Sequence, residues 1–274
     1  MNGERGMMIE NVVKSRLQRG ELALGAWLNL PSLAVARLMA RQGFHWLTVD
    51  AEHGAQHPGL IAEMVATIAD SGVCAPLVRL PTNSVEWYKW ALDAGAFGVV
   101  VPMVNNREDA ERAVSWSRYP PEGMRSIGGA FAHYAWGAAN RADYAAAVNR
   151  ELLVIVQIES AQALANLDEI LSVPGIDVAF VGPNDLHAQL GLAPRSESDE
   201  PAFVAALERI KAAARRYNLA LGIYSSDGVA AAQRVREGFQ MVSITSDVAS
   251  LTAGALHNLT DAGQVPGTAH GTGE

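Results

Sequence analysis

Cysteine is almost absent from this sequence, since Cys74 is the only one in 274 residues. One thiol cannot form an internal disulfide bond, so we expect a reducing compartment and a cytoplasmic protein. The sequence also lacks an apolar run of about 18 residues and a signal-peptide pattern, so it predicts neither a membrane span nor export. Cys74 lies in the apolar stretch GVCAPLVRL, and we interpret it as a small buried hydrophobic residue.

Lysine is scarce as well, with Lys14, Lys89 and Lys211 as the complete set. None of them lies at the end of an expected strand, so a Schiff-base mechanism has no lysine candidate there. The net charge of −8 argues against a nucleic-acid or anionic-membrane partner. It does not exclude a small anionic substrate, which responds to local charge and to backbone N–H groups.

Nucleotide-binding motifs are missing too. No G-x-G-x-x-G follows the first expected strand, and no G-x-x-x-x-G-K-[ST] occurs, so the usual nucleotide-binding patterns are excluded. What the sequence does contain is a large apolar fraction, 49% of its residues, which can form a large buried core.

Strand-like and helix-like segments alternate along the chain. Apolar runs of strand length occur at Leu22–Leu28, Trp46–Asp50, Ala75–Leu80, Phe97–Met103, Leu152–Ser160, Asp177–Val181, Ala220–Tyr224 and Met241–Thr245. Helical patterns occur at Met7–Arg19, Ser32–Gly43, Gly59–Ser71, Asn83–Ala94, Asn106–Ser117, Arg141–Asn149, Ala161–Leu171, Glu200–Tyr217, Gly228–Glu237 and Val248–Thr260. The alternation predicts one α/β domain over residues 1–260, a closed (β/α)8 barrel, with a doubly wound open sheet as the runner-up. Residues 261–274 are expected to form a disordered tail.

The last expected helix has apolar residues at three-to-four spacing, namely Val248, Leu251, Ala255 and Leu259. A stripe of this kind has to be buried against something. It packs either on the helix's own barrel or against a neighbouring subunit, and the spacing leaves both open.

The chemistry is organised around the run LLVIVQIES at 152–160. It reads as a strand buried on both faces, and it ends in Gln157 and Glu159, which share a face because they are two residues apart. Asp185 follows the next apolar run, 26 residues after Glu159 (185 − 159). Carboxyl ends of barrel strands form the active face, so the two acids should lie on adjacent strand ends. This oxygen-only pair predicts a Mg²⁺ or Mn²⁺ site.

Other polar residues at the expected strand ends would converge on the same face. They are Asn29, Asp50, Glu52, His53, Arg79, Asn184, Ser225, Ser226, Ser246 and Asp247. A single acid at a strand end is also a common helix N-cap, and this interpretation stays open for Asp185. His53 and His57 are four residues apart, so a zinc site on a helix is a competing hypothesis, although Gly54 and Pro58 favour a loop or a helix start.

The chain resembles the HpcH/HpaI aldolases, metal-dependent (class II) pyruvate aldolases that include 4-hydroxy-2-oxoheptanedioate aldolase. The resemblance extends from about Met7 to Leu259. The motifs that carry it are GAWLNLPS (25–32), GFHWLTVDAEHG (43–54), PLVRLP (76–81), ALDAGAFGVVVPMV (91–104), YPPEGMRSIGG (119–129), VQIES (156–160) and VGPNDL (181–186).

The resemblance implies specific roles for several residues. Glu159 and Asp185 would hold a divalent metal, with Mg²⁺ or Mn²⁺ foremost and Co²⁺ or Zn²⁺ as further candidates. His53 resembles the catalytic base and Arg79 the residue that stabilises the enolate. Either Asp50 or Asp93 would assist His53, with Asp93 reaching in from a neighbouring subunit. The substrate would contact Gln157, Gly182, Pro183, Asn184 and Asp185.

The resemblance also implies the reaction and the assembly. It predicts an aldehyde-lyase that forms or cleaves 4-hydroxy-2-oxo acids from pyruvate or hydroxypyruvate and an aldehyde, in aromatic-compound or sugar-acid catabolism. The barrel would be of the phosphoenolpyruvate/pyruvate type, in a homohexamer that exchanges the last helix. Two other hypotheses stay open: a CoA-ester lyase of the citrate-lyase β-subunit type, and a non-catalytic ketoacid-binding barrel.

Three segments depart from the family's pattern. Arg125–Ser126 replaces a common Arg-Gly, FAHYAWG (131–137) lacks an arginine that the family often has, and GAQH follows His53. These segments are expected to contact the aldehyde acceptor, so the resemblance does not specify that acceptor.

Overall fold

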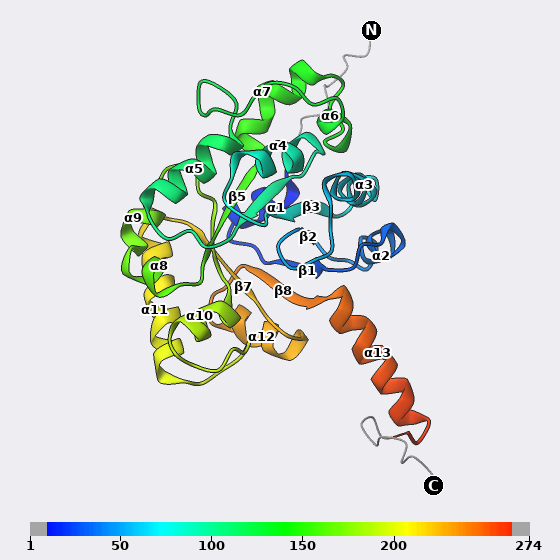
Figure 1. Ribbon diagram of the computed structural model, residues 1–274, viewed down its shortest axis with the longest axis vertical. Coiled ribbons are helices and arrows are strands. Elements are labelled where there is room, and N and C mark those ends of the chain that lie inside the picture. Colours follow the sequence, from blue (N-terminus) through cyan, green and yellow to red (C-terminus); the bar gives the residue numbers. More distant parts are fainter. Residues whose placement is uncertain (1–9, 265–274) are drawn as a thin grey trace.

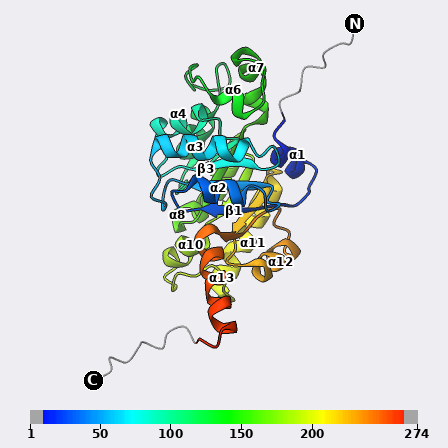
Figure 2. The ribbon, with the colours of Figure 1, turned by 90° about the vertical axis from the view of Figure 1, so that its right-hand side faces the viewer.

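Eight parallel strands form a closed barrel in which each strand pairs with its sequence neighbours and β8 pairs with β1 (Figures 1 and 2). The computed structural model describes residues 10–264. The strands are β1 Ala23–Leu28, β2 Trp46–Asp50, β3 Ala75–Arg79, β4 Gly98–Val101, β5 Leu153–Ile158, β6 Val178–Val181, β7 Ala220–Tyr224 and β8 Met241–Ser246. The predicted barrel is confirmed, and the open-sheet alternative is wrong.

Helices cover the outside of the barrel (Figure 1). Their bounds are α1 Val12–Gln18, α2 Leu33–Met39, α3 Pro58–Ala69, α4 Val85–Asp93, α5 Arg107–Ser117, α6 Ala132–Ala135, α7 Arg141–Glu151, α8 Ala161–Ala165, α9 Leu167–Leu171, α10 Pro183–Gln189, α11 Pro201–Arg216, α12 Gly228–Arg236 and α13 Asp247–Asp261. The sequence did not predict α6 or α10, and one expected helix is divided at Asn166 into α8 and α9. The start of the first expected helix, at residues 7–9, and most of the expected tail, at 265–274, lie outside the described residues.

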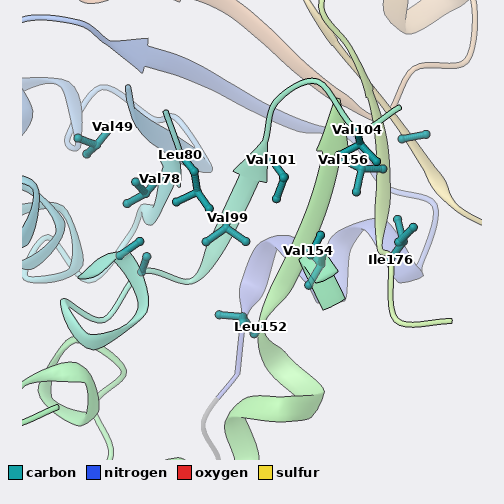
Figure 3. Close-up of a cluster of buried hydrophobic side chains, with 14 of the residues drawn as sticks. Val49, Val78, Leu80, Val99, Val101, Val104, Leu152, Val154, Val156 and Ile176 are labelled. Atoms are coloured by element: carbon teal, nitrogen blue, oxygen red, sulfur yellow. The ribbon is translucent and has the colours of Figure 1, made fainter. Parts of the chain in front are cut away.

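Apolar side chains fill two layers, one inside the barrel and one between the sheet and the helices. The inner layer includes Trp46 and Phe180. Gly25 makes room for Trp46, since a Cβ at Gly25 would lie 2.0 Å from the indole ring. The outer layer is formed by alternate residues of the strands, such as the register partners Val78, Val99 and Val154 (Figure 3). Strands buried on both faces explain why the sequence shows continuous apolar runs.

The amino-terminal helix α1 closes the end of the barrel where the strands begin. Val13 and Leu17 join the inner apolar layer. Lys14, also on this helix, forms a 2.8 Å ion pair with Asp177 just before β6. The opposite end, where the strands finish, is left for a functional site.

The last helix, α13, projects away from the barrel (Figures 1 and 2). Asp247 is its only buried residue, while Val248, Leu251, Leu256 and Leu259 are each at least 42% exposed. The stripe predicted from the sequence therefore does not pack on its own barrel. Within residues 10–264, no helix combines the length and hydropathy needed to cross a membrane.

Candidate active site

A cavity of about 350 Å³ opens at the carboxyl ends of the strands. Its lining includes every residue that the sequence assigned to catalysis, substrate or metal except Asp93. The full lining is Trp27, Asn29, Asp50, His53, Arg79, Gln157, Glu159, Phe180, Gly182, Pro183, Asn184, Asp185 and Tyr224. The predicted convergence on one face is therefore confirmed for the residues in this lining. The other predicted strand-end residues, Glu52, Ser225, Ser226, Ser246 and Asp247, do not line the cavity.

Asp50 is the most completely enclosed acid of this cavity, with no exposed surface. Its two oxygens accept five hydrogen bonds. Two come from Arg79 and one from the side-chain amide of Asn29, at 2.6 to 2.9 Å. The other two come from the backbone N–H groups of Glu52 and His53, at 3.1 and 3.2 Å. Asp50 therefore holds the backbone of His53 and the side chain of Arg79, and the structure shows no contact between Asp50 and the His53 imidazole.

Arg79 is fixed on three sides. It is the register partner of Asp50 across the β2–β3 pair, which explains why the two side chains meet at adjacent strand ends. Its Nε and Nη2 donate to Asp50, and its Nη1 lies 3.1 Å from Glu52 Oε2. The guanidinium stacks over the Trp27 ring, 4.6 Å from the centroid. Burial lowers the pKa of Arg79, but hydrogen bonds and charge from Asp50 outweigh it, so the pKa is raised overall and the cation is retained.

Glu159 lies deep in the cavity, only 3% exposed. Its Oε1 accepts the backbone N–H of Met103 at 2.8 Å, and its Oε2 accepts Nε2 of Gln157 at the same distance. Gly182 allows the carboxylate to lie here, because a Cβ at Gly182 would be 2.0 Å from Oε2. Burial raises the pKa of Glu159 to about 8, assisted by the charges of Glu52 and Asp185 and opposed by the Met103 N–H and Arg79. The surrounding protein therefore stabilises the negative charge of the Glu159 carboxylate only in part.

Asp185 is not at a strand end. β6 stops at Val181, and Asp185 lies in the first turn of α10, whose N-cap, Gly182, has no side chain to cap the helix. The prediction that Asp185 lies at a strand end was wrong, because Gly182 and Pro183 start a helix with proline at its first position. The N-cap hypothesis for Asp185 is also wrong. Asp185 is nevertheless exposed to the same cavity as Glu159.

The donor set of this cavity suits a divalent cation. Within residues 10–264, no three His, Cys, Asp or Glu side chains gather as a metal-binding cluster. Of the three carboxylates that line the cavity, Asp50 is engaged by Arg79 and Asn29, and Glu159 and Asp185 remain for a cation. Mg²⁺ and Mn²⁺ accept carboxylate oxygens and keep positions for water or substrate. Oε1 of Gln157, beside Glu159, is buried without a hydrogen-bond partner and adds a further unused oxygen. The incompletely compensated charge of Glu159 and this oxygen both fit a cation.

His53 follows β2 on a polar loop, and its side chain is 62% exposed. The nearest acid to its imidazole is Glu52, whose Oε2 is 3.8 Å from His53 Nε2. His57 has a different role, because its Nδ1 accepts the N–H of Leu60 at 3.3 Å and caps α3. Neither histidine lies within a helix, so the two do not share a helix face as the zinc hypothesis required.

Asp93 lies outside the cavity of its own chain. It ends α4 and lines an apolar groove of about 760 Å³ between α3, α4 and α6, which we call the α4 groove. Its Oδ1 is 3.2 Å from Nη2 of Arg125. Arg125 is buried, lies 4.4 Å from the Tyr119 ring centroid and donates to the Tyr144 hydroxyl. Arg125, the residue just before the departure at Ser126, thus anchors Asp93.

Sequence reasoning missed two features of this site. One is the aromatic floor formed by Trp27, Phe180 and Tyr224, whose rings meet edge to face at 5.9 and 6.4 Å between centroids. The other is Glu52, which was placed at the mouth but given no role. Strand alternation could have found the floor, since Trp27 is two residues before Asn29 and Phe180 two before Gly182.

The sequence model of the "HpcH/HpaI aldolase/citrate lyase" family matches residues 23–253. A hydroxypyruvate/pyruvate aldolase of Rhizorhabdus wittichii is 35% identical over 252 residues, which cover 92% of this chain and 98% of that protein. A 4-hydroxy-2-oxovalerate aldolase of Novosphingobium aromaticivorans is 42% identical over 190 residues, covering 69% and 71%. Among solved structures, an HpcH/HpaI aldolase/citrate lyase family protein from Burkholderia cenocepacia superposes with a TM-score of 0.86 at 33% identity, covering 93% of this chain and 100% of that one.

Glu159 should make the stability of the metal-free protein depend on pH. Between the ordinary pKa of 4.5 and about 8, the folded state holds a proton that the unfolded state has released. The stability contributed by this proton is present below about 4.5 and is lost as the pH rises towards 8. Glu159→Gln should flatten that loss, because a glutamine amide does not ionise in this pH range.

Urea unfolding in EDTA at several pH values across this range measures the effect. Glu108→Gln, a change to an exposed acid on α5, is the control and should leave the slope unchanged. A Glu159→Gln protein whose stability falls as steeply as the parent's would contradict the assignment.

Proposed function

The chain belongs to the HpcH/HpaI aldolase/citrate lyase family, and we propose that it is a divalent-metal-dependent aldolase that forms and cleaves 4-hydroxy-2-oxo acids. The donor would be pyruvate or hydroxypyruvate and the acceptor an aldehyde, as the names of its relatives suggest. The observation that carries the proposal is one cavity that combines a fixed guanidinium, an exposed imidazole and a carboxylate pair.

Glu159 and Asp185 are the residues that would hold the metal. When bound, a divalent cation would supply Lewis-acid polarisation of the donor's keto group. Glu159 is buried and Asp185 is exposed to the same cavity. Neither carboxylate has a full positive counter-charge in the protein, and this supports a role in holding a cation. Mg²⁺ and Mn²⁺ match the oxygen-only set, and Co²⁺ or Zn²⁺ would also accept it.

His53 would accept the proton of the donor, and Arg79 would stabilise the negative charge that its removal creates. His53 accepts a proton from the methyl carbon of pyruvate or the hydroxymethyl carbon of hydroxypyruvate, which leaves an enolate. Arg79, always protonated and held rigidly by Asp50, stabilises the negative oxygen of that enolate. The enolate carbon then forms the new bond to the aldehyde carbon, and the aldehyde oxygen takes up a proton. Cleavage reverses these steps.

The remaining cavity residues would orient the donor. Gln157 offers an unpaired buried oxygen and lies beside Glu159. Gly182 and Pro183 begin α10, and the backbone N–H groups of Asn184 and Asp185 in its first turn are suited to the donor's carboxylate. Arg79 is the only lysine or arginine among the described residues that line the cavity, which favours a small donor over a CoA ester with several phosphates.

The proposal is tested by turnover with defined substrates. Pyruvate and hydroxypyruvate are screened against a panel of aldehydes, with Mg²⁺, with Mn²⁺ and after EDTA treatment. We expect aldol products that require the metal, and Glu159→Ala should abolish them while the far-UV circular dichroism spectrum stays unchanged. Full aldol activity in EDTA-treated enzyme would contradict the metal-dependent reaction.

His53 should affect proton transfer and not donor binding. In His53→Ala, the exchange of pyruvate methyl protons in deuterated water should fall by about a hundredfold or more, the contribution of a positioned base. Metal and pyruvate affinity should stay near the parent values, because the imidazole is outside the carboxylate pair. His57→Ala, which alters a helix cap, is the control and should retain exchange. Exchange at the parent rate in His53→Ala would mean that the base lies elsewhere.

We infer that the protein assembles as a homo-oligomer, with a hexamer as the expected form. The exposed apolar face of α13 and the α4 groove are both unpartnered within one described chain. Assembly would cover α13 and bring Asp93, held by Arg125, to the His53 of a neighbouring copy. This arrangement would give the imidazole an acid that its own chain holds elsewhere.

Light scattering at micromolar concentration checks the assembly. The parent should scatter as an oligomer, while the double change Leu251→Ser and Leu259→Ser should yield smaller species, because it places hydroxyls on the face that assembly buries. Val229→Ser, on an exposed position of α12, is the control and should not change the mass. A monomeric parent would overturn the assembly.

A further inference from the structure

We propose that Glu52 is a positioning residue that moves between Arg79 and His53 during the reaction. Before the donor binds, the Glu52 carboxylate lies at Nη1 of Arg79. When the donor binds to that side of the guanidinium, the carboxylate turns to the His53 imidazole. The inference rests on the proposed aldolase function, and it assigns a role to a residue that the mechanism above does not use.

The guanidinium of Arg79 has one edge left for a ligand. Asp50 takes the edge formed by Nε and Nη2, and Trp27 covers one face. The edge formed by Nη1 and Nη2 is where a donor oxygen could bind side-on. Glu52 Oε2 lies 3.1 Å from Nη1, so a carboxylate of the protein already occupies part of that edge.

The same oxygen of Glu52 is also near the proposed base. Oε2 is 3.8 Å from Nε2 of His53, too far for a hydrogen bond but within reach of one after a small side-chain rotation. Glu52 thus lies between the cation that would bind the donor and the imidazole that would take its proton.

The backbone allows such a movement without disturbing the loop. The N–H groups of Glu52 and His53 both donate to Oδ1 of Asp50, so the turn between them is fixed. The freedom resides in the side-chain torsions of Glu52. Only 19% of this side chain is exposed where it lies between Arg79 and His53.

Glu52 is more than a structural counter-ion, because Asp50 already neutralises Arg79. A second acid at the same cation carries a desolvation penalty. Burial raises the pKa of Glu52, as do the charges of Asp50 and Asp185, while Arg79 and His53 lower it. Glu159 is a further charged group near Glu52. Displacement from Arg79 would leave an imidazolium at His53 as the favourable partner of Glu52.

The arrangement predicts a specific pattern for Glu52→Gln. Loss of the competing carboxylate should lower the KM for pyruvate in methyl exchange by about fivefold, as expected when a partly buried ion pair no longer has to be broken. The maximal exchange rate should fall by about tenfold, because the imidazolium loses its carboxylate. For the same reason the acidic limb of the pH profile should move to lower pH.

A carboxylate that served only to brace Arg79 would give another result. Its loss would loosen the guanidinium, raise the KM and leave the pH profile in place. That outcome, or an unchanged KM and maximal rate, would overturn the proposal. Glu108→Gln is the control for the loss of one surface charge, and thermal unfolding verifies that each variant is folded.

A binding measurement separates this proposal from the proposed function. Titration calorimetry with pyruvate and Mg²⁺ needs no turnover, and Glu52→Gln should bind pyruvate about fivefold more tightly than the parent. If the parent exchanges no methyl protons with any metal, the aldolase proposal fails. The binding comparison still decides whether Glu52 competes for Arg79, and equal or weaker pyruvate binding by Glu52→Gln would contradict that.

Discussion

The buried ion pair between Asp50 and Arg79 is the interaction on which the mouth of this barrel depends. A carboxylate with no exposed surface is costly unless every lone pair is used, and Asp50 accepts five hydrogen bonds. Through them it joins three strand ends: Asn29 after β1, its own β2 and Arg79 on β3. Removal of one partner from such a pair typically costs about 3–5 kcal/mol, because the other charge is left uncompensated.

The charge balance of the cavity follows from that pair. Asp50 neutralises Arg79, so the remaining acids, Glu52, Glu159 and Asp185, have no full counter-charge in the described chain. Glu159 responds with a pKa raised to about 8, mainly by burial. A divalent cation at Glu159 and Asp185 would remove this imbalance, and the donor's negative charge would then be attracted to the metal and to Arg79. The protein thus separates a hydrophobic barrel interior from a mouth whose acids exceed its cations.

Much of this could be predicted from the sequence, because a barrel strand buried on both faces has an unmistakable apolar pattern. β2 and β7 begin and end at the predicted residues, and polar residues after several strands line one cavity as expected. The sequence could not place Asp185 on α10, since a glycine-proline start after an apolar run fits either a strand end or a helix start. Nor could it show that the Asp50 carboxylate pairs with the Arg79 guanidinium and not with the His53 imidazole. That choice depends on strand register, which pairs positions 50 and 79 directly. The separation of Asp93 from the cavity likewise depends on the packing of α4 against Arg125, 32 residues away.

A double-mutant cycle on Asp50 and Arg79 tests the central claim most directly. The catalytic efficiency, kcat/KM, of pyruvate methyl exchange is measured for the parent, Asp50→Asn, Arg79→Gln and the double variant, each verified as folded by circular dichroism. If Asp50 acts by holding Arg79, the double variant loses no more activity than the worse single variant, because the two changes remove one interaction. Losses that multiply in the double variant would show that the two residues act independently and would contradict the account.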